Sequence, residues 1–220
     1  MTTLTTPPLA PLLAQLFAEA ETTDAALREE MSKLSPEERT ALFSDTDYRA
    51  VYGRVKDRYL AVSRETGVLC YMLARACRAR SIVEFGTSFG ISTLHLAAAL
   101  KDNGGGRVIG TEFEPSKVAR AREHIAAAGL TDFVEIRAGD AVETLAHDLP
   151  ELIDLVLLDG AKGLYCRVLS LLAPRLHAGA LVVADNADMC PEYVAHVRAP
   201  AGGYLSVPVA GGVELSMKMK

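Results

Sequence analysis

Three side chains that could bind a metal ion stand at the ends of two short apolar runs in the second half of the chain. Asp159 ends the run 153–159, Asp185 ends the run 180–185, and Asn186 follows it. Carboxylate and amide oxygens are good ligands for hard cations such as Mg2+ or Ca2+ and poor ligands for soft metals. If the two runs are neighbouring strands, the three side chains form a divalent-cation site. The alternative is that the aspartates cap helices and that Asn186 makes a turn.

A glycine-rich turn, 86–90, follows the apolar run 81–85 and opens a helical stretch. Gly86 allows a sharp turn and a close approach of the backbone to a ligand, and Gly90 allows the next helix to pack near the strand. The spacing is G-x-x-x-G and not the G-x-G-x-x-G that holds a pyrophosphate. Glu84, just before the turn, repels a diphosphate and suits a cationic ligand. Taken alone, the pattern also fits an ordinary tight turn.

Two further acids accompany the next two apolar runs. Glu112 lies near the end of 107–113, and Asp140 follows 133–139. A carboxylate at the first position can accept two hydrogen bonds from a ribose, and one at the second can accept from an adenine amino group. Each acid could instead be solvated or cap a helix. Together with Glu84, they predict a pocket for an adenosine that carries a positive charge.

The elements that must position these residues alternate between strands and helices from residue 81 onward. Short runs that are rich in β-branched residues and separated by helical stretches are typical of a parallel sheet buried on both faces. The predicted strands are 81–85, 107–113, 133–139, 153–159 and 180–185, followed by a hairpin of 204–209 and 212–218. We therefore predict an α/β fold with a doubly wound, mostly parallel seven-stranded sheet and a C-terminal antiparallel hairpin.

No strand is predicted before residue 81. Residues 1–60 are predicted to form a helical N-terminal extension that caps the site or makes a dimer contact, and residues 61–220 to form the domain that holds the site. Within the extension, Ser35 and Glu38 have the spacing of a capping box, with Pro36 at the first helical position.

Composition narrows the classes of protein further. Of the 220 residues, 50% are hydrophobic and 23% are charged, which is typical of a globular protein, and the net charge of -5 argues against a nucleic-acid partner. No apolar run is long enough to cross a membrane, and the N-terminus lacks the basic segment of a secretory signal. The four cysteines form no C-x-x-C pair, so we expect reduced thiols and a cytoplasmic protein.

Residues 81–186 resemble the class I S-adenosylmethionine-dependent methyltransferases. From about Val62 onward, the chain is similar to the small metal-dependent O-methyltransferases of the catechol and caffeoyl-CoA type. The resemblance implies a Rossmann-like methyltransferase fold, S-adenosylmethionine and Mg2+ as cofactors, and a homodimer. It places Glu84 and the Gly86 backbone at the methionyl amino group and Ser92 near the carboxylate. The full set of implied cofactor residues is Val62, Glu84, Gly86, Ser92, Glu112, Asp140, Ala141 and Asp159.

The resemblance also assigns a role to Lys162, three residues after Asp159. The matching lysine of the family accepts the proton of the hydroxyl that is methylated. A bound cation lowers the pKa of such a hydroxyl, and burial beside a dication lowers the pKa of a lysine. We therefore expect O-methylation of a small hydroxylated substrate, an aromatic vicinal diol, with Lys162 as the general base.

Two departures from the family limit the substrate. The chain has no tryptophan for the aromatic gate of the catechol enzyme, and Pro208 stands where that enzyme has a carboxylate that holds the second hydroxyl. Catechol itself is therefore a doubtful substrate. Three alternatives stay open: a metal-independent methyltransferase in which the two aspartates contact the substrate, a nucleoside-cofactor-binding protein without turnover, and an NAD-linked oxidoreductase, which the missing pyrophosphate fingerprint opposes.

Overall fold

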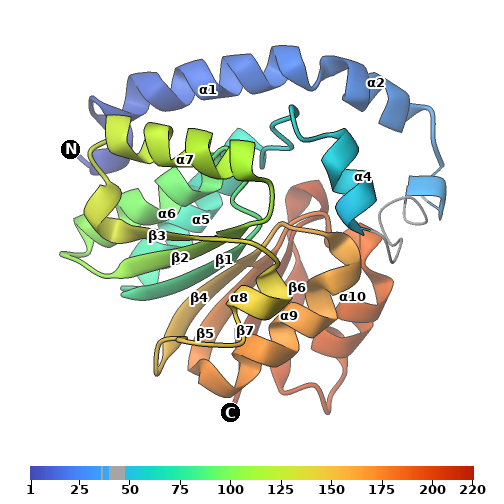
Figure 1. Cartoon of the computed structure of the whole chain (residues 1–220). Helices are drawn as coiled ribbons and strands as arrows, with labels where there is room; N and C mark the ends of the chain where they lie inside the picture. Colours follow the sequence, from blue (N-terminus) through green and yellow to red (C-terminus); the bar gives the residue numbers. More distant parts are fainter. Residues whose placement is uncertain (36, 40–47) are drawn as a thin grey trace.

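The computed structural model describes residues 1–35, 37–39 and 48–220. At its centre, a seven-stranded sheet is formed by β1 (Ser81–Phe85), β2 (Arg107–Glu112), β3 (Val134–Ala138), β4 (Ile153–Leu158), β5 (Leu176–Ala184), β6 (Tyr204–Pro208) and β7 (Glu214–Lys218). Their order is β3-β2-β1-β4-β5-β7-β6 (Figure 1). The strands β1 to β5 pair in parallel, and β7 runs antiparallel to β5 and β6. The predicted sheet and its terminal hairpin are confirmed.

Helices cover both faces of this sheet. They are α1 (Leu9–Thr23), α2 (Ala25–Ser32), α4 (Tyr48–Arg54), α5 (Arg64–Ala76), α6 (Ile91–Asp102), α7 (Pro115–Ala127), α8 (Ala141–Thr144), α9 (Tyr165–Leu172) and α10 (Pro191–Arg198). The helices α5, α6 and α7 lie on one face, and α8, α9 and α10 lie on the other (Figure 1). Each crossover between parallel strands therefore carries a helix that buries one face of the sheet.

Successive side chains of the central strands enter two different apolar clusters, because strand side chains alternate between faces. In β1, Ile82 packs in the cluster with α5 and α6, whereas Val83 packs in the cluster with α9 and α10. Glu84 shares the face of Ile82, so it points beneath the first turn of α6. This alternation decides which strand-end side chains are buried and which reach the edge of the sheet.

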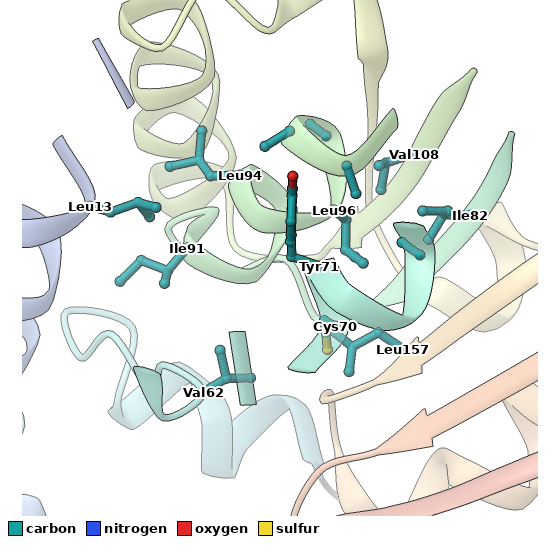
Figure 2. Close-up of a cluster of buried hydrophobic side chains, with 14 of the residues drawn as sticks. Leu13, Val62, Cys70, Tyr71, Ile82, Ile91, Leu94, Leu96, Val108 and Leu157 are labelled. Carbon is teal, nitrogen blue, oxygen red and sulfur yellow. The ribbon is translucent and has the colours of Figure 1, made fainter. Parts of the chain in front are cut away.

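The helix α1 belongs to the first cluster. Its residues Leu13 and Leu16 are buried together with α6, and Figure 2 shows Leu13 beside Ile91 and Leu94. The apolar stripe of α1 is thus covered by the chain's own helices. The boundary predicted at residue 60 stays a prediction, and residues 40–47 of the predicted extension lie outside the described residues.

The predicted element ends differ from the structure mainly in β5. This strand begins at Leu176, before the predicted start at 180, because Leu176 pairs with Ile153 ahead of an irregular register. Ser35 and Glu38 exchange the two hydrogen bonds of the predicted capping box, whereas Pro36 lies outside the described residues. Among the described helices, none has the length and apolar character needed to cross a membrane.

Candidate active site

Two adjoining pockets lie at the carboxyl ends of the strands, where the strand order reverses between β1 and β4. One is lined in part by Glu112, Asp140 and Ala141, and the other by Val62 and Ser92. Both are lined by Leu60, Gly86, Ser88 and Asp159. This is the position at which open α/β sheets bind their ligands. Of the eight predicted cofactor residues, all but Glu84 line these two pockets.

Glu84 lies behind the pockets rather than in their walls. Its carboxylate is fully buried and accepts hydrogen bonds from the hydroxyls of Thr87, Ser92 and Thr93. Burial raises the pKa of Glu84, and the three hydroxyl donors oppose that rise. The carboxylate thereby ties β1 to the glycine-rich turn and to the start of α6. Its predicted contact with a methionyl amino group stays a prediction.

The glycine-rich turn brings β1 very close to the end of β4. Gly86 has a φ of +99°, and a Cβ at this position would lie 2.5 Å from the main-chain oxygen of Asp159. Only glycine combines that backbone conformation with that approach. Gly90 has a φ of +89° at the N-cap of α6, which also favours glycine. The turn therefore places Gly86 and Asp159, a predicted metal ligand, in the wall of both pockets.

Glu112 is held by main-chain donors at the end of β2. The N–H groups of Ser88 and Glu114 each donate to one of its carboxylate oxygens, at 2.9 Å. Lys117, which also lines the pocket, donates from Nζ to Ser88 Oγ at 3.1 Å, and burial lowers its pKa. Ser88 Oγ in turn donates to the carbonyl of Tyr59 at 2.6 Å. Glu112 is thus oriented by the same turn that carries Gly86.

Asp140 both caps α8 and contacts α4. One of its carboxylate oxygens accepts from the N–H of Val142 at 2.8 Å, and the other accepts from the Tyr48 hydroxyl and from Arg49, at 2.6 Å for Arg49. Burial alone would raise the pKa of Asp140, but these hydrogen bonds outweigh burial and hold that pKa below its usual value. Helix α4 therefore lies over this end of the pocket, and Tyr48 and Tyr52 form part of its wall.

Asp159 and Asp185 come together as predicted. The N–H of Asp159 donates to the carbonyl of Phe85, and the N–H of Asp185 donates to that of Leu158, so the pairing of β1, β4 and β5 continues into both residues. Burial raises the pKa of both carboxyl groups, and for Asp159 the charge of Asp185 adds to that rise. Asn186 follows with a φ of +50°, a left-handed conformation that asparagine tolerates better than most residues.

Lys162 reaches the same place from the loop after β4. Its Nζ donates to Asp159 Oδ1 at 3.2 Å, to the Tyr165 hydroxyl at 2.8 Å and to the carbonyl of Asp185 at 3.3 Å. Burial lowers the pKa of Lys162, but the charges of Asp159, Tyr52 and Asp185 outweigh burial and leave it raised. A lysine that acts as a general base must lose its proton near neutral pH, so its pKa was expected to be lowered. For Lys162, such a lowering would require a positive charge nearby.

The helix that carries Tyr48 and Tyr52 was expected to shape the substrate pocket, and both residues line it. The roles of Lys117 and Tyr165, and the hydrogen bonds of Tyr48 and Arg49 with Asp140, were not predicted from the sequence. Lys117 lies on the buried stripe of α7 with Ala121 and His124, and that helical spacing could have marked it as buried. The contacts of α4 with Asp140 join residues about ninety positions apart, and no local pattern indicates them. Within the described ranges, no group of three or more His, Cys, Asp or Glu side chains is placed to hold a metal ion.

The chain is similar to known methyltransferases. Residues 83–187 match the family model of a methyltransferase domain. A protein of Niastella koreensis named catechol O-methyltransferase is 36% identical over 130 residues, which cover 58% of each chain. A protein of Mycobacterium tuberculosis with the same name is 34% identical over 127 residues, covering 58% of this chain and 57% of that protein. The chain thus matches less than two thirds of the length of these curated relatives.

Solved structures show the same fold. The O-methyltransferase TomG of Streptomyces achromogenes, determined in complex with S-adenosylmethionine, is 24% identical, with a TM-score of 0.66 over 92% of this chain and 99% of that one. The segment that matches the family model, residues 83–187, includes the carboxyl ends of β1 to β5, where most of the predicted site residues lie. Residues 83–187 thus match a methyltransferase domain, and the chain is similar over 58% of its length to proteins that are named catechol O-methyltransferase.

Proposed function

We propose that this protein is an S-adenosylmethionine-dependent O-methyltransferase that works with a divalent cation and methylates one hydroxyl of a small aromatic vicinal diol. The observation that carries the proposal is the meeting of Lys162, Asp159 and Asp185 directly beside the pocket lined by the predicted cofactor residues. A proton acceptor, hard-cation ligands and a nucleoside pocket at one sheet edge suit hydroxyl methylation.

The pocket supports S-adenosylmethionine rather than a dinucleotide. Glu112 presents its carboxylate at the end of β2, where a ribose is bound in such sheets, and Asp140 lies at the end of β3. The turn at Gly86 has no pyrophosphate fingerprint. The curated relatives are named catechol O-methyltransferases, and TomG was determined with S-adenosylmethionine.

Asp159, Asp185 and Asn186 would hold the divalent cation, which we propose to be Mg2+. Their oxygens are the donors that hard cations prefer, and the two aspartates lie at neighbouring strand ends with raised pKa values. Two buried carboxylates that disfavour each other's charge are stabilised when a cation binds. When bound, the cation would lower the pKa of a substrate hydroxyl that coordinates it.

Lys162 would accept the proton of that hydroxyl as the oxygen–methyl bond forms and the methyl–sulfur bond breaks. Its Nζ is held by three oxygen atoms and its side chain is only 6% exposed, so the proton acceptor is kept in place and away from bulk water. Alignment of this kind supplies most of the rate in a transfer between two bound reactants. The rings of Tyr48, Tyr52 and Phe85 provide apolar wall for an aromatic acceptor.

The test is transfer of a labelled methyl group from S-adenosylmethionine to a panel of catechols, vicinal diols and hydroxylated aromatic acids. We expect turnover that stops with EDTA, returns with Mg2+ and falls by at least about 100-fold in Lys162→Ala, the scale of a general base. Activity untouched by EDTA favours the metal-independent enzyme. Tight S-adenosylhomocysteine binding without turnover of any acceptor favours a binding protein, and thermal stabilisation by NAD alone favours an oxidoreductase.

The homodimer and the cytoplasmic location implied by the sequence also stay proposals. Because the stripe of α1 is buried within the chain, a dimer would use another surface. Sedimentation velocity at several concentrations measures the assembly state directly, and a single monomer species at all of them would contradict the homodimer.

A further inference from the structure

Tyr165 makes two hydrogen bonds beside the predicted base, and one of them is with Lys162 Nζ itself. Its hydroxyl accepts from Lys162 Nζ and donates to the main-chain oxygen of Asp185, each at 2.8 Å. The side chain is 1% exposed. A tyrosine hydroxyl has one hydrogen, and here it is engaged on Asp185. Tyr165 therefore acts only as an acceptor towards Lys162 and does not compete for the lone pair of the neutral amine.

The ring that carries this hydroxyl is fixed from two sides. Phe85 and Tyr193 both pack edge-on against it, with centroid distances of 6.2 and 5.7 Å. Tyr165 is the first residue of α9, three positions after Lys162 in the short turn Lys162–Leu164. The hydroxyl is thus a rigid point to which the flexible lysine side chain is attached.

Lys162 also contacts Asp159, which we assign to the divalent cation. The Nζ–Oδ1 distance of 3.2 Å is longer than that of a tight charge-assisted hydrogen bond. An ammonium that moved closer would neutralise the carboxylate and compete with the cation for it. The contact with the Tyr165 hydroxyl is shorter, at 2.8 Å.

We propose that Tyr165 is a positioning residue for Lys162: its hydroxyl anchors Nζ beside the main chain of Asp185 and prevents the lysine from closing onto the Asp159 carboxylate. This inference rests on the proposed function, because it assumes that Lys162 is the base and that Asp159 is a cation ligand. It adds a residue that keeps the base and the cation site separate.

The test compares Tyr165→Phe with Tyr193→Phe. Both changes remove one buried hydroxyl and keep the ring, but the hydrogen bonds of Lys162 Nζ go to Asp159, Tyr165 and Asp185 and not to Tyr193. In Tyr165→Phe we expect kcat to fall roughly 10- to 100-fold, the effect of losing a hydrogen bond to a charged group, with the KM for S-adenosylmethionine unchanged. Tyr193→Phe should keep the wild-type kcat, and thermal unfolding checks that both variants are folded.

A second measurement does not depend on turnover. Titration with Mn2+, followed by electron paramagnetic resonance, reports occupancy of the cation site. We expect several-fold weaker Mn2+ binding in Tyr165→Phe, because the released ammonium competes for Asp159. The same change made in a Lys162→Met background should alter neither Mn2+ affinity nor the residual rate, because no ammonium is left to position.

The outcomes separate the two proposals. If Lys162→Met abolishes turnover while Tyr165→Phe keeps the wild-type kcat and Mn2+ affinity, the positioning role is wrong and the proposed function stands. An equal further loss of rate from Tyr165→Phe in the Lys162→Met background also overturns it, because Tyr165 then acts independently of the lysine. If Lys162→Met retains full activity, the assigned base is wrong and the positioning role is overturned with it.

Discussion

Glu112 uses only part of its hydrogen-bonding capacity within the protein. An ionised carboxylate can accept about four hydrogen bonds, and in the described structure two main-chain N–H groups donate to this one. The other lone pairs are available to the two hydroxyls of a ribose. Because those N–H donors orient the carboxylate, the ribose site that we propose would be formed before a ligand arrives.

We therefore expect Glu112→Gln to weaken S-adenosylhomocysteine binding by roughly 10- to 100-fold, the effect of losing hydrogen bonds to a charged acceptor. The amide replaces one acceptor oxygen with a donor and removes the charge. Isothermal titration calorimetry measures the change. Glu123→Gln, on the exposed side of α7, is the matched control and should bind as the wild type does. Equal affinities for both variants would show that Glu112 does not hold the ligand.

At the scale of single residues, the sequence predicted position better than orientation. Asp159 and Asp185 could be placed because strand ends of a parallel sheet meet at one edge. Glu84 could be placed at the turn, but its direction depends on which side of β1 faces α6. The partners of Lys162 depend on the path of the loop after β4, which no pattern in the sequence defines.

At the scale of elements, α4 is joined to the pocket through Asp140. Tyr48 and Arg49 both donate to that carboxylate, and the side chain of Arg49 is largely exposed. These contacts hold α4 over the end of the pocket at Asp140, where we propose that the adenine binds.

We expect the double variant Tyr48→Phe, Arg49→Gln to release S-adenosylhomocysteine about 3- to 10-fold faster. Removing an exposed ion pair and one hydrogen bond weakens the attachment of α4 only modestly. Stopped-flow displacement measures the dissociation rate. Arg54→Gln, at the other end of the same helix, is the control. An unchanged rate in the double variant would mean that α4 does not retain the ligand.

A second contact between elements joins α10 to β7. Arg198 donates from two nitrogens to the carboxylate of Glu214, at 2.8 and 2.6 Å, and Glu214 is 2% exposed. The hydrogen bonds from Arg198 hold the pKa of Glu214 below its usual value, although burial opposes them. The stabilisation is therefore complete above the unfolded pKa and is lost as the pH falls through the lower, folded pKa.

Glu214→Gln should lower the free energy of unfolding by about 1–3 kcal/mol at neutral pH. The difference from wild type should shrink as the pH falls below about 4, because the wild-type carboxyl group then becomes protonated. Urea unfolding at several pH values measures it. A difference that stays constant down to pH 3 would show that the ion pair is not its source.

For the whole molecule, the central question is whether α1 is part of the folded core. Leu16 is 1% exposed within the cluster that includes α5 and α6. We expect Leu16→Ala to cost about 2–5 kcal/mol of unfolding free energy, as buried leucines usually do. Leu152→Ala, at a position that is 57% exposed, should cost less than about 0.5 kcal/mol. Similar small losses for both would mean that α1 contributes little.

The overall fold was predictable because its strands are short, apolar and separated by helices, and each predicted strand range overlaps an observed one. The register of β5 was not, because its first residues pair through an irregular ladder around a polar and glycine-containing stretch. The place of α1 was also not predictable, since an apolar helical stripe does not reveal whether it packs on its own chain or on another.

The close approach at Gly86 has a consequence for anyone who would re-engineer this protein. Any side chain there would push against the main chain of Asp159, 2.5 Å from where its first carbon would lie. A library of variants at this turn, made to accept an altered nucleoside, would therefore also displace Asp159 and the end of β4. Diversity aimed at one reactant is better introduced at Tyr48, which lines the same pocket from α4.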